Sequence, residues 1–154
     1  MTLKIKLDKG AKMPTRAHET DAGLDLYTPK KVIVPGCRGI VSTFLTDIRI
    51  GYATIDTGIH IEIPRGYTGF IKSKSGLAVK HGLTAAGGVI DSGYTGAVVV
   101  KIFNHTEKDY VFEAGDKIAQ LVIMLILNPE IELHQVAQVE ARERGINGFG
   151  STGK

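Results

Sequence analysis

The chain has 154 residues, of which 43% are hydrophobic, and its formal net charge is +3. That length suits one domain that can bury a core of its own, which argues against a disordered or multidomain protein. A single cysteine, Cys37, excludes an intrachain disulfide and argues against a cysteine-based metal site.

The basic residues are scattered rather than grouped. This pattern is typical of a solvated surface; an anionic ligand is the alternative, and nonspecific nucleic-acid binding is a weaker one. The longest apolar run, residues 121–127, is too short to cross a membrane, and the alternating residues 3–7 do not resemble a signal peptide. We therefore expect no direct nucleic-acid or membrane binding and a cytoplasmic location, which is the host cytoplasm for a viral protein.

Short apolar runs separated by glycine and proline turns predict strands along most of the chain. In residues 59–63 three isoleucines should face the core while His60 and Glu62 face solvent, and residues 67–71 should return as the second arm of a hairpin. Residues 98–103 favour a strand buried on both faces. Other predicted strands are 3–7, 32–34, 39–45, 48–50 and 118–123, while 129–142 stay ambiguous between strand and helix. Together these runs predict an all-β domain, a distorted jelly roll or β-sandwich.

Two polar segments in the first half of the chain contain groups that suit an anion or a cation. Asp21 and Asp25 flank a small Ala-Gly pair and would point to the same side of a strand; they are either turn-forming residues or a contact to a hard cation. Residues 72–77 suit a phosphate, because hydroxyl and backbone N–H groups donate, Gly76 admits close approach and a short helix should follow. A solvated loop is an equal alternative there.

The strongest candidate for a functional segment is 88–96. In it a lone carboxylate, Asp91, opens a glycine-rich turn, and Tyr94 follows three residues later. Residues 82–88 predict a hairpin with a bare backbone, able to hydrogen-bond a flat heterocycle or to form only a tight turn. Gln120, within a buried strand, needs hydrogen-bond partners from the protein or from a ligand. Residues 144–154 are glycine-rich and form either a frayed terminus or an arm that orders over a ligand.

Five segments in this order resemble the homotrimeric deoxyuridine triphosphatase (dUTPase) family, namely 21–26, 74–78, 88–96, 115–121 and 144–153. The resemblance covers nearly the whole chain. It implies a jelly-roll domain over 1–142 with an extended hairpin at about 37–56, and a mobile glycine-rich C-terminal arm over 143–154 that closes over the active site. It also implies a homotrimer with shared active sites. The implied reaction is Mg²⁺-assisted hydrolysis of dUTP to dUMP and pyrophosphate, which limits uracil incorporation into DNA and supplies dUMP for thymidylate synthesis.

The same resemblance implies roles for individual residues. Asp91 is the general base that activates the water attacking the α-phosphorus, and Asp25 contacts Mg²⁺ through water. Tyr94 packs on the deoxyribose and leaves no room for a 2′-hydroxyl, while Phe149 covers the uracil. The other implied substrate contacts are Lys74, Ser75, Gly76, Ala85, Gly88, Val89, Ile90, Lys101, Gln120, Arg144, Gly150, Ser151 and Thr152.

The chain also departs from the family pattern. Lys74 and Lys117 stand where arginine is usual, and lysine offers a point charge without a planar fork. Residues 36–57 are longer than in most members, either as a surface hairpin or as a device that binds a protein partner. Two other functions stay open: a dCTP deaminase-like enzyme of the same fold, and a dUTP-binding regulatory protein that contacts a partner through 37–56.

Overall fold

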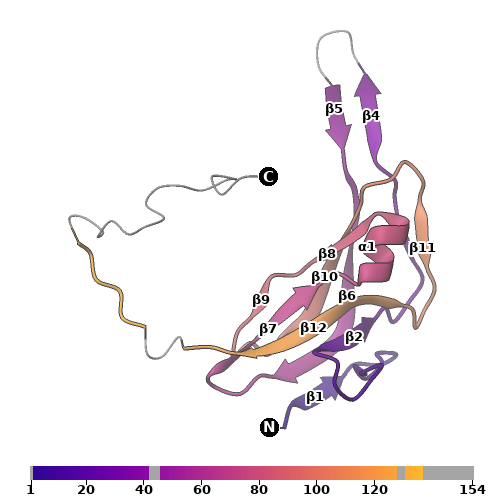
Figure 1. The fold of residues 1–154 in the computed structure, drawn as a ribbon. Helices are drawn as coiled ribbons and strands as arrows, with labels where there is room; N and C mark the ends of the chain where they lie inside the picture. The colour runs from indigo at the N-terminus through magenta and orange to yellow at the C-terminus, as the bar shows by residue number, and fades with distance from the viewer. Residues whose placement is uncertain (1, 42–45, 128–130, 137–154) are drawn as a thin grey trace.

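The computed structural model describes residues 2–41, 46–127 and 131–136. Within them the fold is all-β with one short helix, as the alternating apolar runs predict (Figure 1). The elements in chain order are β1 (Lys4–Leu7), β2 (Gly23–Tyr27), β3 (Val32–Val34), β4 (Arg38–Val41), β5 (Thr46–Arg49), β6 (Gly51–Glu62), β7 (Tyr67–Lys72), α1 (Ser75–His81), β8 (Leu83–Ala86), β9 (Val89–Ile90), β10 (Ala97–Asn104), β11 (Tyr110–Phe112) and β12 (Lys117–Leu125).

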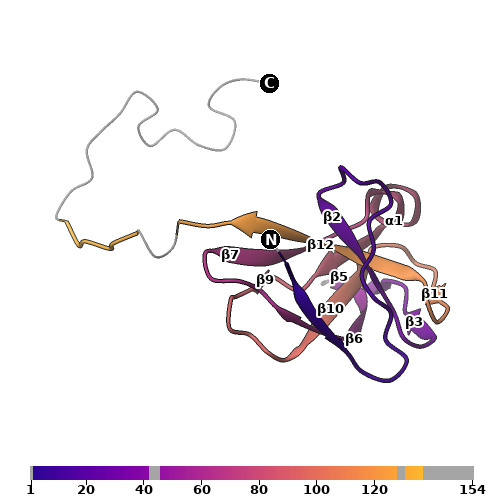
Figure 2. The ribbon, with the colours of Figure 1, turned by 90° about the horizontal axis from the view of Figure 1, so that it is seen from below.

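Two four-stranded antiparallel sheets lie face to face as two layers (Figure 2). The first has the order β1-β6-β10-β8 and the second has the order β2-β12-β7-β9. Strands β3 and β11 form a separate pair, as do β4 and β5. Aliphatic side chains from both four-stranded sheets make one core cluster between the layers. The predicted jelly-roll or sandwich class is therefore confirmed.

The end of β6 and the residue after it follow the sequence pattern, since Ile59, Ile61 and Ile63 are each at most 3% exposed. Strand β10 does not follow the expected burial on both faces. Val98 and Val100 are buried, but Val99 between them is 41% exposed. A strand with one covered face alternates in burial, and no second layer covers the outer face of β10 within the described chain. The expectation of two buried faces is therefore wrong for the single chain.

Both predicted hairpins in the middle of the chain are wrong. Strand β7 does not pair with β6, because the turn at Pro64 carries the chain from one sheet to the other, where β7 pairs with β12 and β9. Residues 82–88 likewise form no closed hairpin. Their strand β8 pairs with β10, and the chain then crosses to the other sheet as β9. An apolar pattern gives the period of a strand but not its partner.

Strands β4 and β5 form the expected surface hairpin, and it projects from the sandwich (Figure 1). Close backbone packing fixes its base. A Cβ added to Gly51 would collide with the carbonyl oxygen of Pro35, and one added to Gly36 would collide with that of Glu107. Residues 42–45 of the predicted strand 39–45 lie outside the described residues. In the described chain, no helix has the length and apolar character needed to cross a membrane.

An irregularity in the ladder between β6 and β10 lies beside the turn that contains Asp91. Ala97 pairs with His60 and Val99 pairs with Asp56, so β6 has three residues where β10 has one. Thr57 closes this gap: its hydroxyl is fully buried and donates to the carbonyl of Val98 at 2.7 Å. A side-chain hydrogen bond therefore replaces a missing backbone one at this position.

We expect Thr57→Val to lower the free energy of unfolding by about 1–2 kcal/mol, because the substitution keeps the shape of the side chain but leaves the buried Val98 carbonyl without its donor. Urea unfolding followed by circular dichroism measures this. Thr57→Ser keeps the hydroxyl and serves as the control, with a smaller loss. Equal stability of the valine variant and the wild type would contradict the role of this hydrogen bond.

Candidate functional site

The first part of the site is a buried carboxylate held between two lysines. Asp25 lies on β2 and is 5% exposed. Lys74, at the residue that precedes α1, contacts one carboxylate oxygen, and Lys117 at the start of β12 contacts the other at 2.7 Å. Burial alone would raise the pKa of Asp25, but the hydrogen bonds from Lys117 and Lys74 outweigh it and hold the pKa below its ordinary value. Asp25 is therefore an ionised carboxylate in a largely dry position.

Gln120 lies on β12, between the strand that carries Asp25 and strand β7. It stands opposite Asp25 on β2 and opposite Lys72 on β7. Its amide donates to the carbonyl of Ser73 at 3.0 Å, and the Ser73 hydroxyl accepts from the backbone N–H of Ala85 at 2.9 Å. A Cβ on Gly23 would collide with the end of the Gln120 side chain, so Gln120 would have to move if this residue carried a side chain. The expected need of Gln120 for a partner is thus met by the protein.

A cavity of about 350 Å³ opens beside this cluster and is lined by Asp21, Asp25, Lys74 and Gln120, among others. The expected short helix follows: α1 begins at Ser75, and no side chain caps its first turn. Gly76 has open space around it, since an added Cβ would meet nothing within 4 Å. The fold itself therefore gives no steric reason for glycine at position 76.

The second part of the site is the turn that joins β9 to β10. Asp91 follows β9 and is exposed, and the backbone N–H of Tyr94 donates to the carbonyl of Asp91 at 3.1 Å. Gly93 has a φ of +94°, which glycine adopts at little cost. The Tyr94 hydroxyl donates to the carbonyl of Ala97 at 2.9 Å, and a Cβ on Gly96 would collide with the tyrosine. The turn therefore fixes where the tyrosine ring lies.

Tyr94 and Asp91 border a cavity of about 260 Å³, whose other lining residues include Gly87, Val89 and Ile90. Gly88, beside it, has a φ of +69°. The backbone of this stretch is partly committed: the Ile90 carbonyl accepts from the Thr68 hydroxyl at 3.0 Å, and the Ala85 N–H donates to Ser73. Gly87, Gly88 and Val89 are exposed, but the Gly88 carbonyl accepts from the backbone N–H of Ile71 at 3.2 Å, so the rest of their backbone is the part that a ligand can reach.

A single chain keeps these two parts apart. Asp25 lies on β2 and Asp91 follows β9, which are the opposite edges of the sheet β2-β12-β7-β9. Three strand spacings of about 4.8 Å separate them by roughly 14 Å across the sheet alone. Lys101 lies elsewhere again, on β10, with its ammonium 3.9 Å from the centre of the Tyr52 ring. The structure therefore brings Asp25, Lys74 and Gln120 together, and Asp91 with Tyr94, but does not join the two groups.

Several expectations need correction or lie outside the described residues. Asp21 does not share a strand face with Asp25: it precedes β2 and accepts from the backbone N–H of His18 at 3.0 Å. Sequence reasoning missed Ser73 as a link to Ala85, because a loop serine has no periodic signal. It also assigned no ligand or partner to His60, which makes two hydrogen bonds. The arm residues Arg144, Phe149, Gly150, Ser151 and Thr152 lie outside the described residues.

Comparison with known proteins gives one consistent result. The family model described as dUTPase matches residues 9–153. A deoxyuridine 5′-triphosphate nucleotidohydrolase of Clostridium tetani is 44% identical over 157 aligned residues, which cover 99% of this chain and 97% of that protein. The solved dUTPase of Staphylococcus bacteriophage 80alpha with dUPNHPP has a TM-score of 0.82 and 33% identity, with 99% of each chain covered. A mutant dUTPase of the S. aureus phage phi11, described as coordinating a structural Mg(II) ion, has a TM-score of 0.74 and 30% identity, covering 92% of this chain and all of that one.

We expect Asp25→Asn to lower the free energy of unfolding by about 1–2 kcal/mol at neutral pH, because both lysines lose their shared counter-charge while remaining partly solvated. The pKa of Asp25 is lowered in the folded chain. Its charge therefore stabilises the fold above the unfolded pKa, and this contribution is lost as pH falls through the folded pKa. Urea unfolding of both proteins should converge on acidification. A difference that stays constant down to acidic pH would contradict this account.

Proposed function

Because this chain belongs to the dUTPase family, we propose that it hydrolyses dUTP to dUMP and pyrophosphate, with Asp91 as the base, at sites shared between three copies of the chain. The observation that carries the proposal is the family match over residues 9–153, together with the solved dUTPase that holds a nucleotide analogue and matches the fold over nearly its full length. The dCTP deaminase-like alternative is not favoured, because the named relatives are dUTP nucleotidohydrolases.

The position of Asp91 supports its role as the base. Its carboxylate is exposed at the end of β9, and no side chain in the described part of the chain hydrogen-bonds to it. It is therefore available to a water molecule. That water attacks the α-phosphorus: a new P–O bond forms, the bond to the pyrophosphate oxygen breaks, and Asp91 takes the proton. The carboxylate must hold the water in line with the leaving group, so its position matters as much as its basicity.

The cavity beside Tyr94 is the proposed place for the nucleoside. The tyrosine ring, held by its hydroxyl on Ala97, would pack on the deoxyribose. The accessible backbone of Gly87, Gly88 and Val89 would face the uracil edge. Matched backbone donors and acceptors discriminate steeply between bases, because a wrong base leaves buried polar groups unpaired.

The cluster around Asp25 is the proposed place for the phosphates. Lys74 supplies a positive charge, Ser75 and Gly76 lie in an uncapped first turn, and Gln120 lines the same cavity as Lys74. The fold gives no steric reason for glycine at position 76. Close approach of a ligand to the backbone would explain why glycine stands there. The arm residues Arg144, Ser151 and Thr152 would contact the outer phosphates, and Phe149 would cover the base; these roles stay predictions, as does that of Lys101.

Mg²⁺ is the proposed cofactor, and the residues present fit it. The described chain has no group of three side chains able to hold a metal by themselves, but Asp21 and Asp25 line one cavity with Lys74. Mg²⁺ keeps several waters and takes phosphate oxygens as further ligands. Each carboxylate oxygen has two lone pairs, so the lysine contacts leave Asp25 with acceptor capacity for the ion's water shell. The bound ion would neutralise phosphate charge.

The strand order supports a shared site. A base at Asp91 and a phosphate site at Lys74 and Gln120 must meet on one nucleotide, yet one chain holds them on opposite edges of a sheet. A second copy that presents its Lys74 cluster to the Asp91 turn of the first resolves this, and a closed ring of three such contacts gives a homotrimer. The cytoplasmic location and a protein partner for residues 37–56 stay predictions.

Pyrophosphate release tests the activity. With Mg²⁺, we expect the wild type to act on dUTP in strong preference to dCTP, dTTP and UTP, and we expect Asp91→Asn to lose roughly 100-fold or more of kcat, because it removes the base. Asp56→Asn is the matched control, since Asp56 is exposed and accepts from Gly58 through an oxygen that asparagine keeps. Undiminished turnover by the Asp91 variant would assign the base elsewhere.

Mixed oligomers test the sharing of sites. Asp91→Asn and Lys74→Ala chains should each be nearly inactive, but co-expressed chains should regain up to roughly a quarter of wild-type activity, because half of the sites have a native Asp91 and half of those face a native Lys74. If each site used one chain only, every site would carry one lesion and mixing would restore nothing. Separately purified chains assayed together without subunit exchange are the control.

A further inference from the structure

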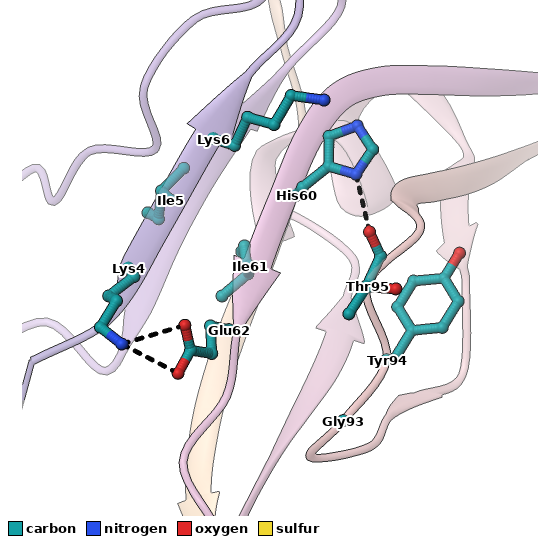
Figure 3. Close-up of a pocket in the computed structure, with 9 residues that line it drawn as sticks. All are labelled: Lys4, Ile5, Lys6, His60, Ile61, Glu62, Gly93, Tyr94 and Thr95. Carbon is teal, nitrogen blue, oxygen red and sulfur yellow. Dashed lines mark hydrogen bonds and ion pairs between the residues drawn. The ribbon is translucent and has the colours of Figure 1, made fainter.

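His60 lies on β6, opposite Ala97 of β10 and Lys6 of β1. Its side chain points away from the core and is 23% exposed. Figure 3 shows the ring beside the turn residue Thr95. The cavity here has a volume of about 540 Å³ and is lined by residues of β1, β6 and the segment 93–95. Nδ1 lies 2.8 Å from the carbonyl oxygen of Thr95, and Nε2 lies 3.1 Å from a carboxylate oxygen of Asp8. The ring therefore bridges the segment after β1 and the turn after β9.

Both partners of the His60 ring accept hydrogen bonds. A backbone carbonyl has no proton to give, and an ionised carboxylate has none either. The pKa of Asp8 is lowered, chiefly by its hydrogen bond with His60, so Asp8 stays ionised. A neutral imidazole has one N–H and can satisfy only one of the two partners. The doubly protonated ring satisfies both, and the hydrogen bonds to Thr95 and to Asp8 raise the pKa of His60.

The turn depends on contacts at its two ends. At the β9 end, Ile90 is held by pairing with β7 and by the Thr68 hydroxyl. At the β10 end, the Tyr94 hydroxyl donates to the carbonyl of Ala97, the first residue of β10. Within the described chain, His60 is the one side chain that hydrogen-bonds to residues 91–96 from outside them. Without it, the downstream half of the turn would keep the bond from Tyr94 to Ala97 but would receive no side-chain hydrogen bond from another described element.

We propose that His60, as an imidazolium anchored on Asp8, is a positioning residue that holds the turn carrying Asp91 and Tyr94 in its working place. This rests on the proposed function of those two residues. His60 does not touch the reacting atoms: it acts through the Thr95 carbonyl, next to Tyr94. Since a displacement of about 1 Å can cost 100-fold in rate, one hydrogen bond to this turn is enough to affect the reaction.

Other charged and titratable groups also lie around the His60 ring. Lys6 on β1 lies 3.4 Å from Asp8 and opposes the charge on His60; Lys4 and Glu62 pair with each other at 3.1 Å; Tyr94 on the turn is the other titratable group lining the cavity. Because the pKa of His60 is raised in the folded chain, both hydrogen bonds are present below the unfolded pKa. A neutral ring has one N–H, so one of the two hydrogen bonds is lost as pH rises through the folded pKa.

Two isosteric substitutions separate the two bonds of the ring. The amide nitrogen of asparagine can take the place of Nδ1, and that of glutamine can take the place of Nε2. His60→Asn therefore keeps a donor for Thr95, whereas His60→Gln keeps only the contact to Asp8. With dUTP as substrate, we expect His60→Gln to lose about 10-fold in kcat and His60→Asn to recover most of that loss. The ratio of wild-type to His60→Asn kcat should also fall as pH rises through the pKa of His60.

A readout independent of activity uses the folded full chain. Nitrogen-15 spectra of labelled histidine should show both His60 ring nitrogens protonated at neutral pH, assigned by their absence in His60→Asn. Amide exchange at Tyr94 should accelerate in His60→Gln but not in His60→Asn. Equal kcat and equal exchange in both variants, or a ring with one proton at neutral pH, would overturn the proposal. If the wild type failed to hydrolyse dUTP, the proposed function would fall, while the spectra and exchange would still decide what His60 holds.

Discussion

Strand β7 lies between β12 and β9, and the rest of the molecule's chemistry depends on that order. It places the lysine-held Asp25 at one edge of a sheet and the turn of Asp91 at the other. Under the proposed function neither edge is a complete site for a nucleoside triphosphate, since the lysines that would bind phosphates lie at one edge and the exposed carboxylate and the aromatic ring lie at the other. The backbone hydrogen bonds of the sheet hold the two edges at a fixed distance. The proposed association of copies would bring the two parts together without motion within one chain.

The two segments that carry most of the proposed site residues occupy the same kind of position in the fold. Residues 73–82 connect β7 of one sheet to β8 of the other, and residues 91–96 connect β9 of one sheet to β10 of the other. A segment that crosses between sheets leaves the hydrogen-bonded ladder, so its backbone and side chains are free to face a ligand. The same freedom removes the ladder as a restraint. Side chains supply the missing restraints: Thr68 and His60 at one crossing, and Ser73 and Gln120 at the other.

Period-two patterns predicted the strands well, because burial of one face is a local property that a run such as Ile59-His60-Ile61 displays directly. Which strands pair with one another was harder to predict. The turns after β6 and β8 resemble hairpin turns, yet both lead to the other sheet, and nothing local distinguishes the two outcomes. The family resemblance predicted Asp25, Lys74 and Asp91 as site residues without any structure, and those roles stay predictions. It could not show that Lys117 completes the clamp on Asp25, since that contact joins strands far apart in the sequence.

His60 illustrates why alternation alone misleads at a functional turn. In a strand pattern an outward histidine between isoleucines looks like a solvated residue. Its two partners come from Asp8 and Thr95, which are far from it in the sequence on either side. The gap in the ladder at Thr57 to Ile59 lies immediately before it in β6, where the strand departs from regular pairing with β10. An irregular strand beside an exposed turn needs extra hydrogen bonds to stay in register. A charged ring that donates to both sides meets this need, and it thereby makes the geometry of the turn sensitive to the protonation of a group outside it.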